Sequence, residues 1–272
     1  TQGAWAVDAQ VSFMGAGPGL VLDERTGFLY FTANEKDARE RHLYRVRLDG
    51  TGRTRLTRED GTHRTVMSPD GRSYVDTWSN VTPPPQVRVS SQDGTKRWTL
   101  EENAHPPILD FERASLEWVN VAAKDGTTLH ASLVKPASFD PLRRYPVLVR
   151  VYGGPHAQDV TNTWNQVSPA EHLGASRGFL VWKLDNRGTT ARGTAFESAT
   201  FRALGRVELE DQLAGVEHLK ALPFVDPARI GITGGSYGGY MTLYALTNAP
   251  DTFRAGVAIS SVTDWKLYDS IY

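Results

Sequence analysis

The sequence predicts an α/β domain that follows a region of repeated short β-strands. Residues 1 to about 105 repeat themselves at an offset of 44 residues. From about residue 110, apolar strand-like runs alternate with amphipathic segments at helical spacing. Such alternation is typical of a mostly parallel sheet covered on both faces. Within this second region, the stretch Gly234-Gly-Ser-Tyr-Gly238 stands between a strand-like run and a helix-like one.

Composition limits the classes of protein to consider. The 272 residues are 40% hydrophobic and 22% charged, which is ordinary for a soluble globular protein of one large or two modest domains. The net charge of −1 gives no electrostatic footprint for nucleic acid. Cysteine is absent, which excludes disulfides and Cys-ligated metals. No apolar run approaches the roughly 18 residues that a membrane span needs. Because the start lacks both Met and a signal-peptide pattern, we expect the chain to begin within a longer protein.

The repeat in the first region has the form of two blades of a β-propeller. Gly27 and Tyr30 recur as Gly71 and Tyr74, and the turn Asp49-Gly-Thr51 recurs as Asp93-Gly-Thr95. Each unit contains apolar strands and an Asp-Gly turn of the kind that hairpins use. A period of about 40 to 45 residues with four short strands is typical of a propeller blade, although two blades cannot close a propeller. The alternative is a plain β domain of two hairpins.

The second region supplies the strands and helices of the α/β domain. We expect its first two strands to form a hairpin around Lys124-Asp-Gly126. The later strands are near-continuous apolar runs, as expected of strands buried on both faces. The expected strands are 115–122, 128–134, 145–152, 178–185, 230–233 and 255–260, and the expected helices are 206–222 and 240–246.

Ser236 is the candidate nucleophile. Gly234-x-Ser236-x-Gly238 between a strand and a helix has the form of a nucleophile elbow, the sharp turn of α/β-hydrolases that exposes a serine hydroxyl at a helix N-terminus. The backbone N–H of Tyr237 would be one oxyanion donor. The other should come from the loop after the third strand, Tyr152-Gly-Gly-Pro155, where Tyr152 could offer its hydroxyl. The alternatives are a glycine-rich turn without chemistry and a strand-end tyrosine packed on the sheet.

The general base is missing from the expected place. In the α/β-hydrolase order, the acid and then the His follow the serine. Only 36 residues follow Ser236, and they contain no His; the seven His residues that precede it are His42, His63, His105, His130, His156, His172 and His218. His156 adjoins the Gly-Gly-Pro loop, but we interpret it as a surface or entrance residue. We therefore expect the hydrolase domain to be incomplete at its C-terminus, with about two strands absent.

Four motifs in one order resemble the prolyl oligopeptidase family of serine peptidases. They are Tyr152-Gly-Gly-Pro155, Asp185-Asn-Arg-Gly188, Glu208-Leu-Glu-Asp-Gln212 and Gly234-Gly-Ser-Tyr-Gly-Gly-Tyr240. The last stretch, 262–272, is similar to the dipeptidyl peptidase IV pattern. The resemblance covers nearly the whole chain and implies the last blades of a β-propeller (1–105) followed by a truncated α/β-hydrolase domain (106–272).

The resemblance assigns roles to particular residues. It implies that Ser236 forms the acyl-enzyme, and that the Tyr152 hydroxyl and the Tyr237 N–H form the oxyanion hole. It also implies a compact apolar pocket whose flat walls suit a proline ring. The residues that would line this pocket are Tyr237, Val262, Trp265, Tyr268 and Tyr272. By spacing alone, the last three could instead form one face of a core helix.

Two departures from the family pattern affect the expected specificity. The paired glutamates that hold a substrate's amino terminus in dipeptidyl peptidase IV have no match in this chain. Gly235 stands where relatives of that type commonly have Trp. We therefore keep three hypotheses: a serine exopeptidase that releases N-terminal dipeptides with penultimate Pro or Ala, another family branch (an acylaminoacyl peptidase or an oligopeptidase), and a non-catalytic binding protein.

The remaining expectations concern cofactors, partners and cellular location. No metal or organic cofactor is expected, because no His or carboxylate groups stand at ligand spacing. The expected partners are peptide substrates, with no nucleic acid and no membrane span in this chain. The family resemblance allows a homodimer of the full-length protein. It favours a periplasmic or secreted location over a cytoplasmic one.

Overall fold

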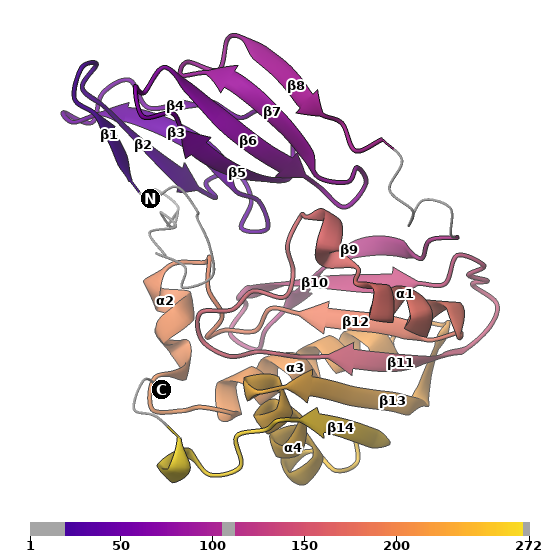
Figure 1. Ribbon diagram of the computed structural model, residues 1–272. Helices are drawn as coiled ribbons and strands as arrows, with labels where there is room; N and C mark the ends of the chain where they lie inside the picture. The colour runs from indigo at the N-terminus through magenta and orange to yellow at the C-terminus, as the bar shows by residue number, and fades with distance from the viewer. Residues whose placement is uncertain (1–19, 105–111, 269–272) are drawn as a thin grey trace. The chain divides into compact units, whose positions relative to one another are not determined.

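The computed structural model describes residues 20–104 and 112–268 (Figure 1). The chain divides into two compact units. The first contains Thr1–Leu109 together with the short segment Thr161–Gln166, and the second contains Asp110–Val160 and Val167–Tyr272. No sequence pattern predicted that residues 161–166, which follow the third strand of the α/β region, would belong to the first unit.

The first unit contains two four-stranded antiparallel sheets, each with its strands in sequence order. This arrangement confirms the propeller blades and excludes the plain two-hairpin domain. The turn glycines of the two blades match: φ is 69° at Gly27 and 67° at Gly71, and it is 83° at Gly50 and 73° at Gly94. The strands are β1 (Val21–Asp23), β2 (Phe28–Ala33), β3 (His42–Arg47), β4 (Thr54–Arg55), β5 (Thr62–Met67), β6 (Ser73–Ser79), β7 (Gln86–Ser91) and β8 (Arg97–Glu101).

The segment Thr161–Gln166 is attached to this unit by hydrogen bonds. The Asn162 backbone N–H donates to the Arg39 carbonyl at 2.7 Å, and its Nδ2 donates to Glu40 Oε1 at 2.9 Å. Glu40 Oε2 in turn lies 3.1 Å from Nε2 of the fully buried His42. Buried polar groups need such partners, so this network fixes the segment to the blade.

The second unit is built on a six-stranded mixed sheet of order β14-β13-β11-β12-β10-β9. β10 pairs antiparallel with β9 and β12, whereas the β11–β12, β11–β13 and β13–β14 pairs are parallel. The parallel part and the initial hairpin both agree with the sequence prediction. The strands are β9 (Ser115–Ala122), β10 (Thr128–Lys135), β11 (Tyr145–Arg150), β12 (Leu180–Leu184), β13 (Val225–Gly235) and β14 (Ala255–Ile259).

Helices cover both faces of this sheet. Adjacent residues of a strand point to opposite faces: in β12, Val181 packs with Ala175, whereas Trp182 packs in the main core with Val216 and Met241. The first contact comes from α1 and the others from α3 and α4. The helices are α1 (Pro169–Ser176), α2 (Thr194–Glu197), α3 (Arg206–Lys220) and α4 (Tyr237–Asn248), with short 3₁₀ turns η2 (Trp164–Gln166), η3 (Ser198–Thr200) and η4 (Trp265–Leu267).

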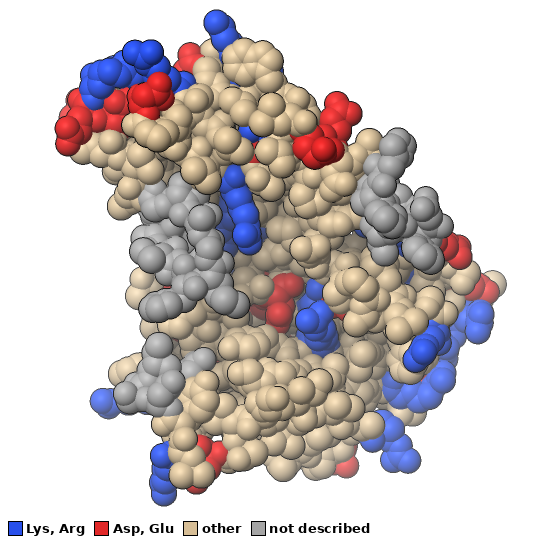
Figure 2. All heavy atoms as spheres, in the orientation of Figure 1, with Lys and Arg blue, Asp and Glu red and all other residues tan. Residues whose placement is uncertain are grey.

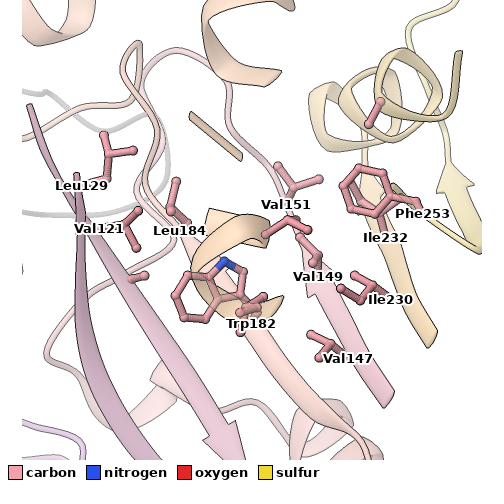
Figure 3. Packing of buried hydrophobic residues seen from close by; sticks show 14 of the residues in the cluster. Val121, Leu129, Val147, Val149, Val151, Trp182, Leu184, Ile230, Ile232 and Phe253 are labelled. Atoms are coloured by element: carbon pink, nitrogen blue, oxygen red, sulfur yellow. The ribbon is translucent and has the colours of Figure 1, made fainter. Parts of the chain in front are cut away.

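The main core lies between the sheet and the helices α3 and α4. Figure 3 shows Trp182 and Leu184 near the valines of β11 and the isoleucines of β13. Gly215 of α3 makes close packing possible, because a Cβ at this position would lie 2.8 Å from a Leu184 methyl carbon. In β14, an edge strand of the six-stranded sheet, Val257 and Ile259 are 61% and 56% exposed.

The face of the molecule drawn in Figure 2 has no dominant charge of one sign. On the face drawn in Figure 2, acidic and basic side chains are interspersed among uncharged ones. Within residues 20–104 and 112–268, no helix is long and apolar enough to cross a membrane.

Candidate active site

Ser236 occupies a strained turn between β13 and α4. Its backbone has φ 55° and ψ −120°, a conformation that costs energy for any residue with a side chain. The residue is exposed, and as the N-cap of α4 its side chain makes no capping hydrogen bond. The hydroxyl is therefore presented to solvent at the positive end of the helix dipole. The predicted strand–turn–helix context is present.

Three of the four glycines around Ser236 are required by close packing. A Cβ at Gly234 or Gly238 would lie 2.3 Å or 2.1 Å from the carbonyl oxygen of Val151, and one at Gly239 would lie 2.3 Å from Ser261 Oγ. Gly235 is different, because its nearest atom would be 3.8 Å away, an ordinary contact. Close approach of neighbouring chain therefore accounts for Gly234, Gly238 and Gly239 but not for Gly235.

The first amides of α4 precede the hydrogen-bond series of the helix. The N–H of Tyr240 donates to the Ser236 carbonyl at 3.1 Å and begins the helical hydrogen-bond series. The amides before it have no partner within the helix, as at every helix N-terminus. The N–H of Tyr237, the predicted oxyanion donor, is the first of these.

The Tyr152–Pro155 loop lies directly against Tyr237. A Cβ at Gly154 would be 2.6 Å from the Tyr237 ring, and the rings of Tyr152 and Tyr237 have centroids 6.0 Å apart. The loop is held by hydrogen bonds to its backbone: the Tyr152 N–H donates to Asp159 Oδ2 at 2.9 Å, and Asn186 Nδ2 donates to the Gly153 carbonyl at 2.9 Å. Tyr152 also packs against the core. The two predicted oxyanion residues are thus neighbours.

The aromatic residues predicted to line a pocket are partly brought together. Trp265 lies 5.6 Å from Tyr237 and 5.9 Å from Tyr268, measured between ring centroids, and Val262 is buried. Residues 265–267 form a 3₁₀ turn, and Tyr268 has an extended backbone, so the alternative of a core-helix face is wrong for these residues. Asp264 begins the turn by accepting a hydrogen bond from the Lys266 N–H at 2.9 Å. Tyr272 lies outside the described residues.

Two carboxyls that the sequence did not single out, the buried Asp185 and the half-buried Asp159, lie next to the Tyr152 loop. Asp185 Oδ1 accepts a hydrogen bond from the Asp159 N–H at 2.7 Å, and Asp159 holds the Tyr152 amide. Burial, followed by the charge of Asp159, raises the pKa of Asp185 to about 8. Burial also raises the pKa of Asp159. The motif beginning at Asp185 was noticed only as part of a resemblance, and this geometry gives it a structural role.

Glu208 lies in the first turn of α3, where an exposed carboxylate would complement the helix dipole. Instead, Glu208 is fully buried and accepts a hydrogen bond from the Tyr237 hydroxyl at 2.5 Å. Burial raises the pKa of this carboxyl.

The described histidines make other contacts or lie on the surface. In the first unit, His42 and His63 lie against Glu40 and Asp76. In the second unit, His156 is exposed, in agreement with its interpretation as a surface residue. His130 contacts Asn120 Oδ1, and His172 Nδ1 accepts a hydrogen bond from the Ala114 amide. The ring of His218 stacks on that of Trp182. His105 lies outside the described residues. Across residues 20–104 and 112–268, no three His, Cys, Asp or Glu side chains form a group that could hold a metal ion.

Comparison with known proteins places this arrangement in a family. A model of the dipeptidyl peptidase IV (DPP IV) N-terminal region matches residues 1–85, and the prolyl oligopeptidase family model matches residues 165–272. The chain belongs to the prolyl oligopeptidase family. Within that family it is dipeptidyl peptidase IV-like, and its fold is that of propeller blades followed by an α/β-hydrolase domain.

Relatives in the prolyl oligopeptidase family match the chain from end to end. The chain is 36% identical to a probable dipeptidyl-aminopeptidase B of Emericella nidulans and 33% identical to one of Metarhizium robertsii; each match covers 100% of this chain and 30% of the relative. The crystal structure of Porphyromonas gingivalis dipeptidyl peptidase 4 matches with a TM-score of 0.88 and 35% identity, covering 100% of this chain and 37% of that one. The chain thus spans about a third of the length of the relatives that it matches.

Proposed function

We propose that the protein carrying this chain is a serine exopeptidase of dipeptidyl peptidase IV type, which releases N-terminal dipeptides with penultimate Pro or Ala. One observation carries the proposal. Ser236 is exposed, strained and uncapped at the start of α4, beside the aromatic group formed by Tyr152, Tyr237 and Trp265. A serine in this position is suited to nucleophilic attack.

The proposal gives each group one role in the reaction. Ser236 Oγ attacks the carbonyl carbon of the penultimate residue and gives its proton to a His base. The negative oxygen that forms is stabilised by the Tyr237 N–H and the Tyr152 hydroxyl. The C–N bond then breaks, the amine leaves with the proton from the His, and the dipeptide remains as an ester on Ser236. Water, activated by the same His, releases the dipeptide and regenerates the serine.

The substrate side chain would occupy an aromatic pocket. Tyr268 is exposed and Trp265 is half-buried, whereas Tyr237 and Val262 are buried beside them; the Trp265 ring contacts the rings of both Tyr237 and Tyr268. A proline ring is rigid and apolar, so it gains contact with flat walls at a low entropic cost. Tyr272, which lies outside the described residues, is assigned to this pocket only by the family resemblance.

The His and the acid of the triad are proposed to come from residues beyond this chain. Three described His residues of the second unit have contacts elsewhere, and His156 lies on the surface. We therefore expect the 272-residue chain by itself to show no turnover. Removing a triad member typically costs several orders of magnitude in rate.

The test uses the full-length protein that carries this chain and its Ser236→Ala variant. A fluorophosphonate should label the first protein at Ser236 and leave the variant unlabelled. Hydrolysis of Gly-Pro-p-nitroanilide should disappear with the same substitution, falling by on the order of 10³-fold or more. The separate 272-residue chain serves as the control without the base and should release no product.

The rival functions give different results in these assays. Cleavage of an N-acetylated residue or of an internal Pro bond, with no activity on free dipeptide amides, would favour another branch of the family. Absence of labelling and of turnover in the full-length protein would favour the non-catalytic binding protein. Labelling at a residue other than Ser236 would refute the assignment of the nucleophile.

A further inference from the structure

Glu208 is a buried carboxyl for which neither the helix nor the reaction gives a reason. It is the third residue of α3 and is 0% exposed. A carboxylate that only complemented the helix dipole would be as effective at the surface. A buried carboxyl is costly unless hydrogen bonds compensate for the lost water. For Glu208, Oε1 accepts from the Tyr237 hydroxyl, while Oε2 has no hydrogen-bond partner within the described part of the chain.

The hydrogen bond to Tyr237 has the geometry of a strong one. The two oxygens are 2.5 Å apart, within the range of a hydroxyl that donates to a carboxylate. Such a bond is about twice as strong as one between neutral groups, and it is strongly directional. It links the first turn of α3 to the first residue of α4. A second tyrosine hydroxyl, that of Tyr240, donates to the Leu204 carbonyl just before α3 at 3.2 Å.

Tyr237 is held from several sides. Its hydroxyl is fixed by Glu208, and its ring lies on the backbone of Gly154, where a Cβ would be 2.6 Å away. Three further rings lie around it, those of Tyr152, Tyr240 and Trp265. Their centroids are 6.0, 5.4 and 5.6 Å from the centroid of the Tyr237 ring. These stacking contacts are compatible with several tilts of the ring. The Glu208 hydrogen bond selects one of them.

We propose that Glu208 is a positioning residue, which fixes the plane of the Tyr237 ring and with it the first amide of α4. It thereby sets how well the pocket distinguishes a proline ring from a smaller side chain. The inference rests on the proposed function, in which Tyr237 lines the pocket and binds the oxyanion. Glu208 touches neither substrate nor reacting atom, and it acts through Tyr237.

The experiment compares variants of the full-length protein on Gly-Pro- and Gly-Ala-p-nitroanilide. Glu208→Leu removes the acceptor at similar size. It should lower kcat/KM for the proline substrate about tenfold more than for the alanine substrate, because only the proline ring reaches the displaced wall. Glu208→Gln keeps an acceptor oxygen and should restore most of this ratio.

Tyr237→Phe removes the same hydrogen bond from the other side, with the loss of one oxygen atom. It should reproduce the change in the Pro/Ala ratio even if Glu208→Leu fails to fold. The double variant, Glu208→Leu with Tyr237→Phe, should be no worse than either single one, because both remove one interaction.

Asp211→Asn is the matched control for a merely structural effect. Asp211 lies on the same helix, is buried, and pairs with Arg187 at 2.7 Å rather than with Tyr237. This variant should lower the free energy of unfolding without changing the Pro/Ala ratio. An equal change of ratio in Asp211→Asn and Glu208→Leu would overturn the inference.

Failure of the inference and failure of the proposed function are distinguishable. Wild-type turnover with a Pro/Ala ratio that stays within roughly twofold in both Glu208→Leu and Tyr237→Phe would overturn the inference and leave the function standing. A wild-type protein that releases no dipeptide would overturn the proposed function. In that case the crystal structure of Glu208→Leu decides the inference: an unmoved Tyr237 ring refutes it, and a displaced ring supports it.

Discussion

Gly238→Ala is the substitution that most directly tests the packing of the Ser236 turn. Gly238 lies in the first turn of α4, and a Cβ there would be 2.1 Å from the Val151 carbonyl oxygen and 3.0 Å from Tyr152 Cα. Both of these are backbone atoms. They cannot move aside by a change of rotamer, so the end of β11 and the start of α4 would have to separate.

The expected cost follows from two opposing effects. Alanine is favoured over glycine within a helix by up to about 1 kcal/mol. Overpacking costs about 1–3 kcal/mol, and a clash between backbone atoms belongs at the upper end of that range. The free energy of unfolding should therefore fall by about 2 kcal/mol. For a domain of roughly 150–250 residues this corresponds to a decrease in Tm of about 4–8 °C.

The assay is urea unfolding of the full-length protein, following the transition of the hydrolase domain, together with the rate of fluorophosphonate labelling at Ser236. Gly235→Ala is the matched control. This position is only three residues away, but its added Cβ would meet its nearest atom at 3.8 Å. It should be nearly neutral in both assays, whereas Gly238→Ala should also slow labelling because Tyr152 is displaced.

Equal stability of the two alanine variants would refute this reasoning. It would mean that the approach of Val151 to α4 relaxes without cost. A large loss in Gly235→Ala would be equally damaging, because the added Cβ would meet no atom closer than an ordinary van der Waals contact.

Two further predictions concern the groups that hold the Tyr152 loop. Because the pKa of Asp185 is about 8 against a normal 3.8, the folded state keeps a proton that the unfolded state releases, so the free energy of unfolding should fall as pH rises between these values. Asp185→Asn, which is neutral throughout, should reduce this slope in urea unfolding at about pH 5 and pH 8; an unchanged slope would contradict the assignment. Asn186→Ala removes the donor to the Gly153 carbonyl, should cost about 1–3 kcal/mol, and should slow labelling of Ser236. Loss of stability with an unchanged labelling rate would show that the loop keeps its position without this bond.

The elements whose pattern is local could be predicted from the sequence. The repeat of Asp-Gly turns located both propeller blades, because positive φ at the turn glycines leaves a direct mark on residue choice. The same applies to the turn around Ser236, where Gly234 and Gly238 are required by contact with one carbonyl. The hairpin around Gly126 is marked in the same way, with φ of 85°.

Features that depend on pairing between distant residues could not be predicted. Glu208 has the sequence context of a surface residue in a first helical turn, and only the position of Tyr237, far along the chain, makes its burial favourable. Likewise, nothing near Asn162 indicates its hydrogen bond to Glu40. The spacing of Trp265 and Tyr268 suggested a helix, but Asp264 ends up capping a single 3₁₀ turn. Spacing alone does not distinguish these conformations.

The single carbonyl of Val151 has a consequence for the entropy of binding. Both Gly234 and Gly238 lie against it, and the Val151 N–H donates to the Thr233 carbonyl at 2.9 Å. The strand that leads to Tyr152 and the turn that contains Ser236 are therefore joined through both backbone groups of Val151, its N–H and its C=O. A ligand that contacts both residues meets a geometry that was ordered when the protein folded. Little conformational freedom of the protein remains to be lost on binding, so more of the contact energy appears as affinity.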